Sequence, residues 1–444
     1  MTPAARLSAA IEVFAEIDTR RRPVADVLKD WGLSHRFAGS SDRAAIAGLV
    51  YDALRRKSSS CWLMGQGTPR AALLGMLKRE RGLDEPAIEE LCSGARFAPA
   101  PLSEAEKASL GAEALAGAPA PVAGDYPEWL DPYFVKVFGE DRAAEGTALA
   151  TRAPLDLRVN TLKAEREEIL PKLAHLNAAP TQWSPIGLRI RLGADSKNPA
   201  IHAEPPFRKG EIEVQDEGSQ LAALFAGAKP GEQVVDLAAG AGGKTLALAA
   251  AMDNRGQIYA TDIDKRQLLP IHERIARAGA RNIQVRTPRG RPDEAPAGGA
   301  GLGWGLDDLV GRADLVLIDA PCTGTGTWRR NPDAKWRVRP GALAERVREQ
   351  AALLDRAAPL TKQGGRIAYV TCSVLDDENG QQISAFIART PGFSVEKPAE
   401  VAETLGERAY HFLQAALISG QGLLMTPRRT DTDGFFVSLI RRTS

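Results

Sequence analysis

Two cysteines and an aspartate follow predicted buried strands in the C-terminal half of the chain. The apolar stretch 315–318 predicts a central parallel strand, and Asp319 and Cys322 follow its end. A second strand is predicted at 366–370, and Cys372 follows it. Open α/β sheets bind their ligands at the carboxyl ends of the strands. A carboxylate and two thiols placed there are suited to hydrogen bonding and nucleophilic catalysis.

The segment after Cys322 combines glycines with positive charge. Residues 323–327, TGTGT, predict a flexible loop, and the chain continues with Arg329, Arg330 and Lys335. An acid and a thiol beside a basic loop suggest a reactive site that faces an anionic substrate. The alternative is that the aspartate caps a turn and that Cys322 packs as a small core residue. Two cysteines at equivalent ends of successive strands are hard to explain by packing alone.

A glycine-rich turn earlier in the chain predicts a cofactor site. A strand at 234–236 runs into Gly240, Ala241, Gly242, Gly243 and Lys244. The helix 245–251 and the strand 257–261 follow, and Asp262 closes that strand. Glycines let the backbone approach a cofactor closely, and the N-terminus of the helix offers free N–H groups. An acid at the end of the next strand can accept hydrogen bonds from a ribose.

The bulk properties place the chain among globular proteins of two or three domains. It has 444 residues, of which 44% are hydrophobic and 25% charged, with a net charge of +1 that excludes a uniformly basic protein. The four cysteines and five histidines form no metal-binding spacing, so we expect no metal and no disulfide framework. We also expect no membrane segment, a cytoplasmic location with reduced thiols, and a monomer.

Composition and periodicity divide the chain into four parts. Residues 1–100 predict a helical domain whose basic side chains either contact RNA phosphates or form a solvated helix face. Residues 101–124, rich in alanine and proline, predict a linker. Residues 125–210 predict a small α+β unit, and residues 211–444 predict the domain that carries the chemistry. We expect the helical domain to be separable and to add RNA affinity alone.

Several segments in a fixed order resemble a known family. They are RVNTLK, VQDEGSQ, DLAAGAGGKT, ATDIDKRQL, LVLIDAPCTGTGTWRRNPDAKW, YVTCSVLDDENGQQI and DGFFVSLIRR, and they cover the chain from Arg158 onward. The chain resembles the RsmB/Sun family of RNA cytosine-5 methyltransferases. The resemblance implies an α/β fold with a Rossmann-like class I methyltransferase sheet and S-adenosylmethionine as cofactor. It also implies a small α+β RRM-like unit before that sheet, and the helical N-terminal part resembles an all-α NusB-like domain.

The resemblance also implies roles for individual residues. Cys372 would attack carbon 6 of a cytosine, and Cys322 would assist the loss of the carbon 5 proton and product release. Asp319 would hold the edge of the base, supported by Lys244. The implied cofactor-binding residues are Asp236, Ala239, Gly240, Ala241, Gly242, Gly243, Lys244, Asp262, Arg266 and Asp319. Arg329, Arg330 and Lys335 are expected to contact RNA phosphates.

The chain departs from the family pattern at two places. The glycine turn usually contains a cysteine and a proline, as in CAAPGG, whereas this chain has LAAGAGG. The segment NIQVRTPRGR lacks the acid that normally lies near the adenine.

Three functions remain open at this stage. The leading one is methylation of a cytosine in ribosomal RNA. The others are methylation of transfer RNA and a non-catalytic role as an RNA-binding ribosome assembly factor. The altered glycine turn is the only support for the last of these, and the joint presence of Asp319, Cys322 and Cys372 opposes it.

Overall fold

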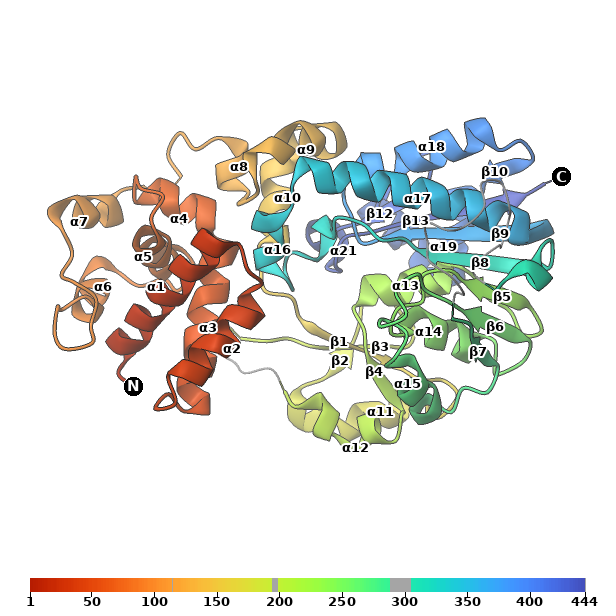
Figure 1. Ribbon diagram of the computed structural model, residues 1–444, viewed down its shortest axis with the longest axis horizontal. Helices are drawn as coiled ribbons and strands as arrows, with labels where there is room; N and C mark the ends of the chain where they lie inside the picture. The colour runs from red at the N-terminus through yellow and green to blue at the C-terminus, as the bar shows by residue number, and fades with distance from the viewer. Residues whose placement is uncertain (114, 194–198, 288–304, 444) are drawn as a thin grey trace. The chain divides into compact units, whose positions relative to one another are not determined.

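The computed structural model describes residues 1–113, 115–193, 199–287 and 305–443. The described chain forms two compact units, shown in Figure 1. The first contains Met1–Ala153, Gly193 and Trp328–Val338. The second contains Pro154–Leu192 and the described residues from 199 onward, apart from Trp328–Val338. Among the helices described, none is long and apolar enough to span a bilayer.

The first unit is helical, and no strand occurs in residues 1–100, as predicted. Apolar residues at helical spacing bury one face of each helix in a common core that includes Phe14, Ile46 and Leu73. The α-helices of this unit are α1 (Pro3–Arg20), α2 (Val24–Ser34), α3 (Ser40–Arg55), α4 (Lys57–Leu63), α5 (Pro69–Arg79), α6 (Glu85–Leu91), α7 (Glu104–Gly111), α8 (Ala120–Ala123), α9 (Asp131–Phe138), α10 (Arg142–Leu149) and α16 (Pro332–Arg337). The specific NusB-like resemblance stays a prediction.

The predicted boundaries at residues 124 and 210 stay a prediction, although packing groups the helices after residue 124 with the helical unit. Helices α9 and α10 belong to the first unit, because the Tyr126 ring stacks on Phe134 and Phe134 stacks on Trp328. The helical unit also contains a segment from much later in the sequence, Trp328–Val338. It includes α16, whose Trp336 donates from Nε1 to the Leu54 carbonyl at 2.7 Å and packs on the helical core.

The second unit begins with a small antiparallel sheet in the order β2-β3-β1-β4. Its strands are β1 (Leu155–Val159), β2 (Ala179–Pro180), β3 (Gly187–Ile190) and β4 (Ile212–Val214), accompanied by α11 (Arg166–Lys172) and α12 (Pro205–Arg208). The strands bury Leu157, Leu188 and Ile212. The predicted α+β unit is therefore present, but its last strand lies beyond residue 210.

The larger sheet has the order β11-β12-β13-β9-β8-β5-β6-β7, with β10 paired to β13. Strands β5 to β9 are mutually parallel, and β13 is antiparallel to β9. The bounds are β5 (Gln233–Asp236), β6 (Gln257–Ala260), β7 (Ile283–Val285), β8 (Ala313–Asp319), β9 (Thr361–Thr371), β10 (Phe393–Val395), β11 (Leu417–Ile418), β12 (Leu423–Met425) and β13 (Phe435–Arg442). This is the predicted Rossmann-like sheet with an antiparallel strand inserted beside the last parallel one.

Helices cover both faces of this sheet, with α17 and α18 on one face and α13 and α14 on the other (Figure 1). Their bounds, with those of the remaining helices, are α13 (Glu217–Phe225), α14 (Gly243–Ala251), α15 (Ile271–Ala278), α17 (Pro340–Leu360), α18 (Gly380–Arg389), α19 (Pro398–Ala402), α20 (Ala409–Ala415) and α21 (Pro427–Thr430). The helix predicted at 265–278 begins only after Pro270, because the residues before it form a turn.

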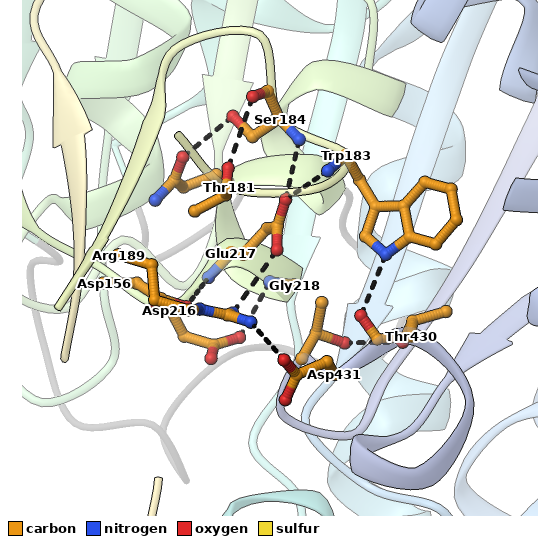
Figure 2. A network of polar contacts seen from close by, with 12 residues as sticks. Asp156, Thr181, Trp183, Ser184, Arg189, Asp216, Glu217, Gly218, Thr430 and Asp431 are labelled. Atoms are coloured by element: carbon orange, nitrogen blue, oxygen red, sulfur yellow. Dashed lines mark hydrogen bonds and ion pairs between the residues drawn. The ribbon is translucent and has the colours of Figure 1, made fainter. Parts of the chain in front are cut away.

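A buried polar network joins the small sheet to the larger domain, as Figure 2 shows. Arg189 on β3 makes two parallel bonds of 2.7 Å to the carboxylate of Asp156 on β1. The same guanidinium reaches Glu217 at the start of α13 and Asp431 after α21. Asp156 and Glu217 have fully buried side chains, so this one cation compensates two desolvated carboxylates.

We predict that Arg189→Leu lowers the free energy of unfolding by about 3–5 kcal/mol, because it leaves two buried carboxylates without their cation. Arg191 is the matched control, since it also pairs with Asp431 but its side chain is 76% exposed. Arg191→Leu should change stability by about 0.5 kcal/mol or less. Denaturant unfolding of both variants measures the free energy of unfolding. An equal decrease in Arg189→Leu and Arg191→Leu would contradict the role assigned to the network.

Candidate active site

The register of β8 and β9 brings the two cysteines together. Asp319 pairs with Val370 across the ladder, so Cys322 and Cys372 leave the sheet at the same edge. Their Sγ atoms lie 3.3 Å apart, and both side chains are partly accessible. The pKa of the Cys322 thiol is raised well above its usual value by its hydrogen bond with Cys372, by burial and by nearby negative charge. Cys322 is therefore held as a protonated thiol.

The segment after Cys322 is packed, so the prediction of a flexible loop at 323–327 is wrong. Thr325–Thr327 form a 3₁₀ turn in which Thr325 is fully buried. The amide of Gly326 donates to the Cys372 carbonyl at 2.9 Å, and its carbonyl accepts from Gly434. A Cβ at position 326 would lie 2.1 Å from the Gly434 oxygen, so only glycine fits here. The two cysteine-bearing segments are thus fixed to each other.

Asp319 and Lys244 form an ion pair at this edge, with 2.7 Å between Nζ and Oδ2. The Lys244 side chain is only 7% exposed and its ammonium also lies 5.0 Å from the centre of the Phe435 ring. Asp319 keeps 36% of its side chain exposed. The carboxylate is accordingly oriented from one side and open to a ligand on the other.

The glycine turn lies at the end of β5 and leads into α14. Gly242 has a φ of 82°, and a Cβ there would lie 2.5 Å from Cγ1 of Ile271. The turn is held from outside: Arg274 donates to the Ala241 carbonyl and Arg158 donates to the Gly243 carbonyl, each at 2.7 Å. These two arginines supply rigidity to a turn that lacks the usual proline.

Two acids flank the turn. Asp236 ends β5, accepts from Thr245 Oγ1 at 2.7 Å, and has its pKa raised to about 7 by burial. Its Oδ1 atom is buried without a partner. Asp262 follows β6 and accepts from the amides of Gly240 at 3.0 Å and Asp264 at 2.9 Å. The orphaned oxygen, the glycine cradle and the helix N-terminus fit S-adenosylmethionine. Each carboxylate oxygen of Asp262 has a further lone pair for a ribose hydroxyl.

Two features of the predicted cofactor site differ from the sequence-based expectation. Arg266 has a side chain that is 86% exposed and pairs with Asp264 at 3.0 Å. Beyond β7, Arg286 is paired with Asp308, which accepts from its guanidinium through both carboxylate oxygens. The part of NIQVRTPRGR after Thr287 lies outside the described residues. Asp308 lies in the 3₁₀ turn Asp307–Leu309.

The structure gives no support to the predicted RNA phosphate contacts of Arg329 and Lys335. Both belong to the helical unit, with exposed fractions of 2% and 1%. The Lys335 ammonium donates to the Arg55 carbonyl at 3.0 Å and lies 4.9 Å from the centre of the Trp336 ring. Burial lowers its pKa to about 7. Arg330 is half-buried, and its role stays a prediction.

Comparisons with known proteins agree with this geometry. The family model described as 16S rRNA methyltransferase RsmB/F matches residues 223–441, and the RsmF/B-like ferredoxin-like domain matches residues 126–195. A "Probable ribosomal RNA small subunit methyltransferase B" of Synechocystis is 32% identical over 325 residues, which are 71% of this chain and 67% of the relative. The chain belongs to the RsmB/F family of methyltransferases.

Other relatives extend the match. The ribosomal RNA small subunit methyltransferase B of Citrobacter koseri is 36% identical over 60% of this chain and 58% of its own length. The solved structure of PH0851 is 25% identical, covers 99% of both chains and has a TM-score of 0.68. S-adenosylmethionine is the cofactor of this family, as predicted. The ferredoxin-like match, residues 126–195, contains strands β1 to β3 of the small sheet together with α9 and α10.

We predict that Asp262→Ala weakens S-adenosylmethionine binding by about 1.5–3 kcal/mol, because it removes a charge-assisted bond to the ribose and the acceptor of the Gly240 amide. Asp264→Ala is the control, because among the described residues its carboxylate pairs with the exposed Arg266 alone. Calorimetry measures the S-adenosylmethionine affinity of the two folded variants. Unchanged affinity in Asp262→Ala would place the cofactor elsewhere.

We predict that stability rises with pH between about pH 7 and pH 10 through Lys335. In this window the folded protein has lost the Lys335 proton, whereas the unfolded chain, with a lysine pKa near 10.4, still binds it. The thermal stability of the native protein relative to Lys335→Met should therefore increase with pH. Lys397→Met, at a side chain 81% exposed, should show no such change. If the difference in thermal stability between the native protein and Lys335→Met does not change with pH, the pKa of Lys335 is not lowered in the folded protein.

Proposed function

We propose that the protein transfers a methyl group from S-adenosylmethionine to carbon 5 of a cytosine in RNA, through a covalent adduct between Cys372 and carbon 6. The observation that carries the proposal is the pair of thiols 3.3 Å apart beside the Asp319–Lys244 ion pair. Nucleophilic attack requires one thiol. A second thiol beside it is explained by a reaction in which the carbon 5 proton must also be removed.

The chemistry follows from the base and the side chains. Cytosine carbon 5 is a poor nucleophile, but addition of the Cys372 thiolate to carbon 6 makes it enamine-like. Bound S-adenosylmethionine supplies an electrophilic methyl group on its sulfonium. Asp319, oriented by Lys244, holds the edge of the base and stabilises the charge that develops at the ring nitrogen. Cys322 is protonated in the resting site, so it first loses its thiol proton to bulk water. The resulting thiolate accepts the carbon 5 proton, and the electrons of that C–H bond restore the 5,6 double bond and expel the Cys372 thiolate.

The substrate class is RNA, and we infer that it is ribosomal RNA. Support comes from the family, whose model is described as 16S rRNA methyltransferase RsmB/F, and from relatives named for the small ribosomal subunit. The target base must be single-stranded or flipped out of its helix to reach a strand end of this sheet. Transfer RNA is the alternative substrate. The packed cysteine pair argues against the non-catalytic assembly factor.

We predict opposite outcomes for the two cysteine variants. Cys372→Ala has no nucleophile and should neither methylate RNA nor form an adduct. Cys322→Ala should attack and take the methyl group but fail to release the product, giving a protein–RNA complex that survives denaturation. Denaturing gels of each variant with RNA and S-adenosylmethionine measure this directly.

The double variant Cys322→Ala/Cys372→Ala is the control and should trap nothing. A trapped complex with Cys372→Ala, and none with Cys322→Ala, would reverse the assignment and make Cys322 the nucleophile. If no variant and no native protein methylates or traps RNA, while S-adenosylmethionine still binds, the assembly factor becomes the better account.

A further inference from the structure

One buried carboxylate touches the segments that follow both cysteines, and no reaction step above uses it. Glu378 lies at the end of a 3₁₀ turn, Asp376–Glu378, and is fully buried. Its Oε1 accepts from the Thr323 amide at 2.8 Å, and its Oε2 accepts from the hydroxyls of Thr323 and Ser373, each at 2.5 Å. Thr323 follows Cys322, and Ser373 follows Cys372.

A second group extends this contact to the other side of Cys322. The Gln350 amide on α17 donates to Glu378 Oε1 at 3.1 Å and to the Pro321 carbonyl at 2.9 Å. The neighbouring Asn379 completes the arrangement, since its amide donates to the Ser373 carbonyl at 2.9 Å. The residues on both sides of Cys322, and the residue after Cys372, are therefore bonded to one buried cluster centred on Glu378.

We propose that Glu378 is a positioning residue for the reaction: its carboxylate fixes the segment after Cys322 to the segment after Cys372 and so sets the distance between the two thiols. The catalytic part of this inference rests on the proposed cytosine chemistry. A carboxylate this deeply buried is costly to desolvate, and its four hydrogen bonds compensate for that cost. A purely structural link between two loops would not require a charge at this position.

The charge has a consequence for the cysteines. Negative charge on Glu378 raises the pKa of Cys322, together with the Cys372 hydrogen bond and burial. The Gly324 amide acts in the opposite direction and lowers the pKa of this thiol. Burial and negative charge on Cys322 and on Glu378 raise the pKa of the neighbouring Tyr369 hydroxyl. Glu378 thus favours Cys322 as the protonated thiol of the resting site.

The decisive variant is Glu378→Gln, which preserves shape and removes charge. The glutamine oxygen can still accept from the Thr323 amide and Gln350, and its NH₂ group can donate to the two hydroxyls. The control is Asp377→Asn, which removes the same charge from the adjacent, partly exposed residue of the turn. S-adenosylmethionine binding by calorimetry confirms that each variant is folded.

The first measurement is the pH dependence of Cys322 alkylation by iodoacetamide, followed by peptide mass spectrometry in the full-length protein. The midpoint should fall to lower pH in Glu378→Gln and stay unchanged in Asp377→Asn. A midpoint equal to that of the native protein in Glu378→Gln would overturn the proposal. This measurement requires no RNA, so it decides the role of Glu378 even if the proposed methylation fails.

The second measurement is methylation of RNA by Glu378→Ala, which removes the link itself. Misplacing reacting groups by about 1 Å can reduce a rate on the order of 100-fold, so kcat should fall by about that factor while S-adenosylmethionine affinity is retained. Glu378→Gln should recover most of the geometry and therefore show a smaller loss. An unchanged kcat in Glu378→Ala would also overturn the proposal. Absence of methylation by the native protein would instead refute the proposed function.

Discussion

The parallel ladder between β8 and β9 is the constraint on which the site depends. Its register aligns Asp319 with Val370, so the chain segments that carry Cys322 and Cys372 leave the sheet side by side. The strands themselves are fully apolar in their centres, because both faces are covered by helices. On the other side of β8, β5 and β6 place the glycine turn and Asp262 at the same edge. The glycine turn and the two thiols lie at one edge of the sheet because the strands are parallel.

The ferredoxin-like sheet supports the cofactor side of this arrangement. Arg158 on β1 reaches the Gly243 carbonyl, and Asn160 donates to the Ala278 carbonyl at the end of α15 at 2.8 Å. The network around Arg189 fixes the same sheet to α13 and to the segment before β13. Buried charges are stable only when each has a partner, so these contacts allow little freedom between the sheet and the cofactor turn. The small sheet and the large sheet therefore form one compact unit.

Sequence patterns predicted the strands and their terminal residues well, and long-range packing poorly. Asp262, Asp319 and the two cysteines are recognisable because each follows a strand of clear hydrophobic pattern. Glu378 carries no such signal, since its partners lie 5 to 55 residues away in the chain and meet it only in the fold. Lys335 was misjudged for a related reason: a basic residue in a loop is expected to face solvent, but α16 packs among the N-terminal helices.

The central claim is that this chain methylates a cytosine of ribosomal RNA at carbon 5. Bisulfite sequencing of ribosomal RNA from a strain that lacks the gene tests it most directly, because 5-methylcytosine resists the conversion that unmodified cytosine undergoes. The account predicts that one cytosine loses its protection and that the native gene restores it, whereas a Cys372→Ala copy does not. Unchanged protection at every ribosomal cytosine, or rescue by Cys372→Ala, would contradict it.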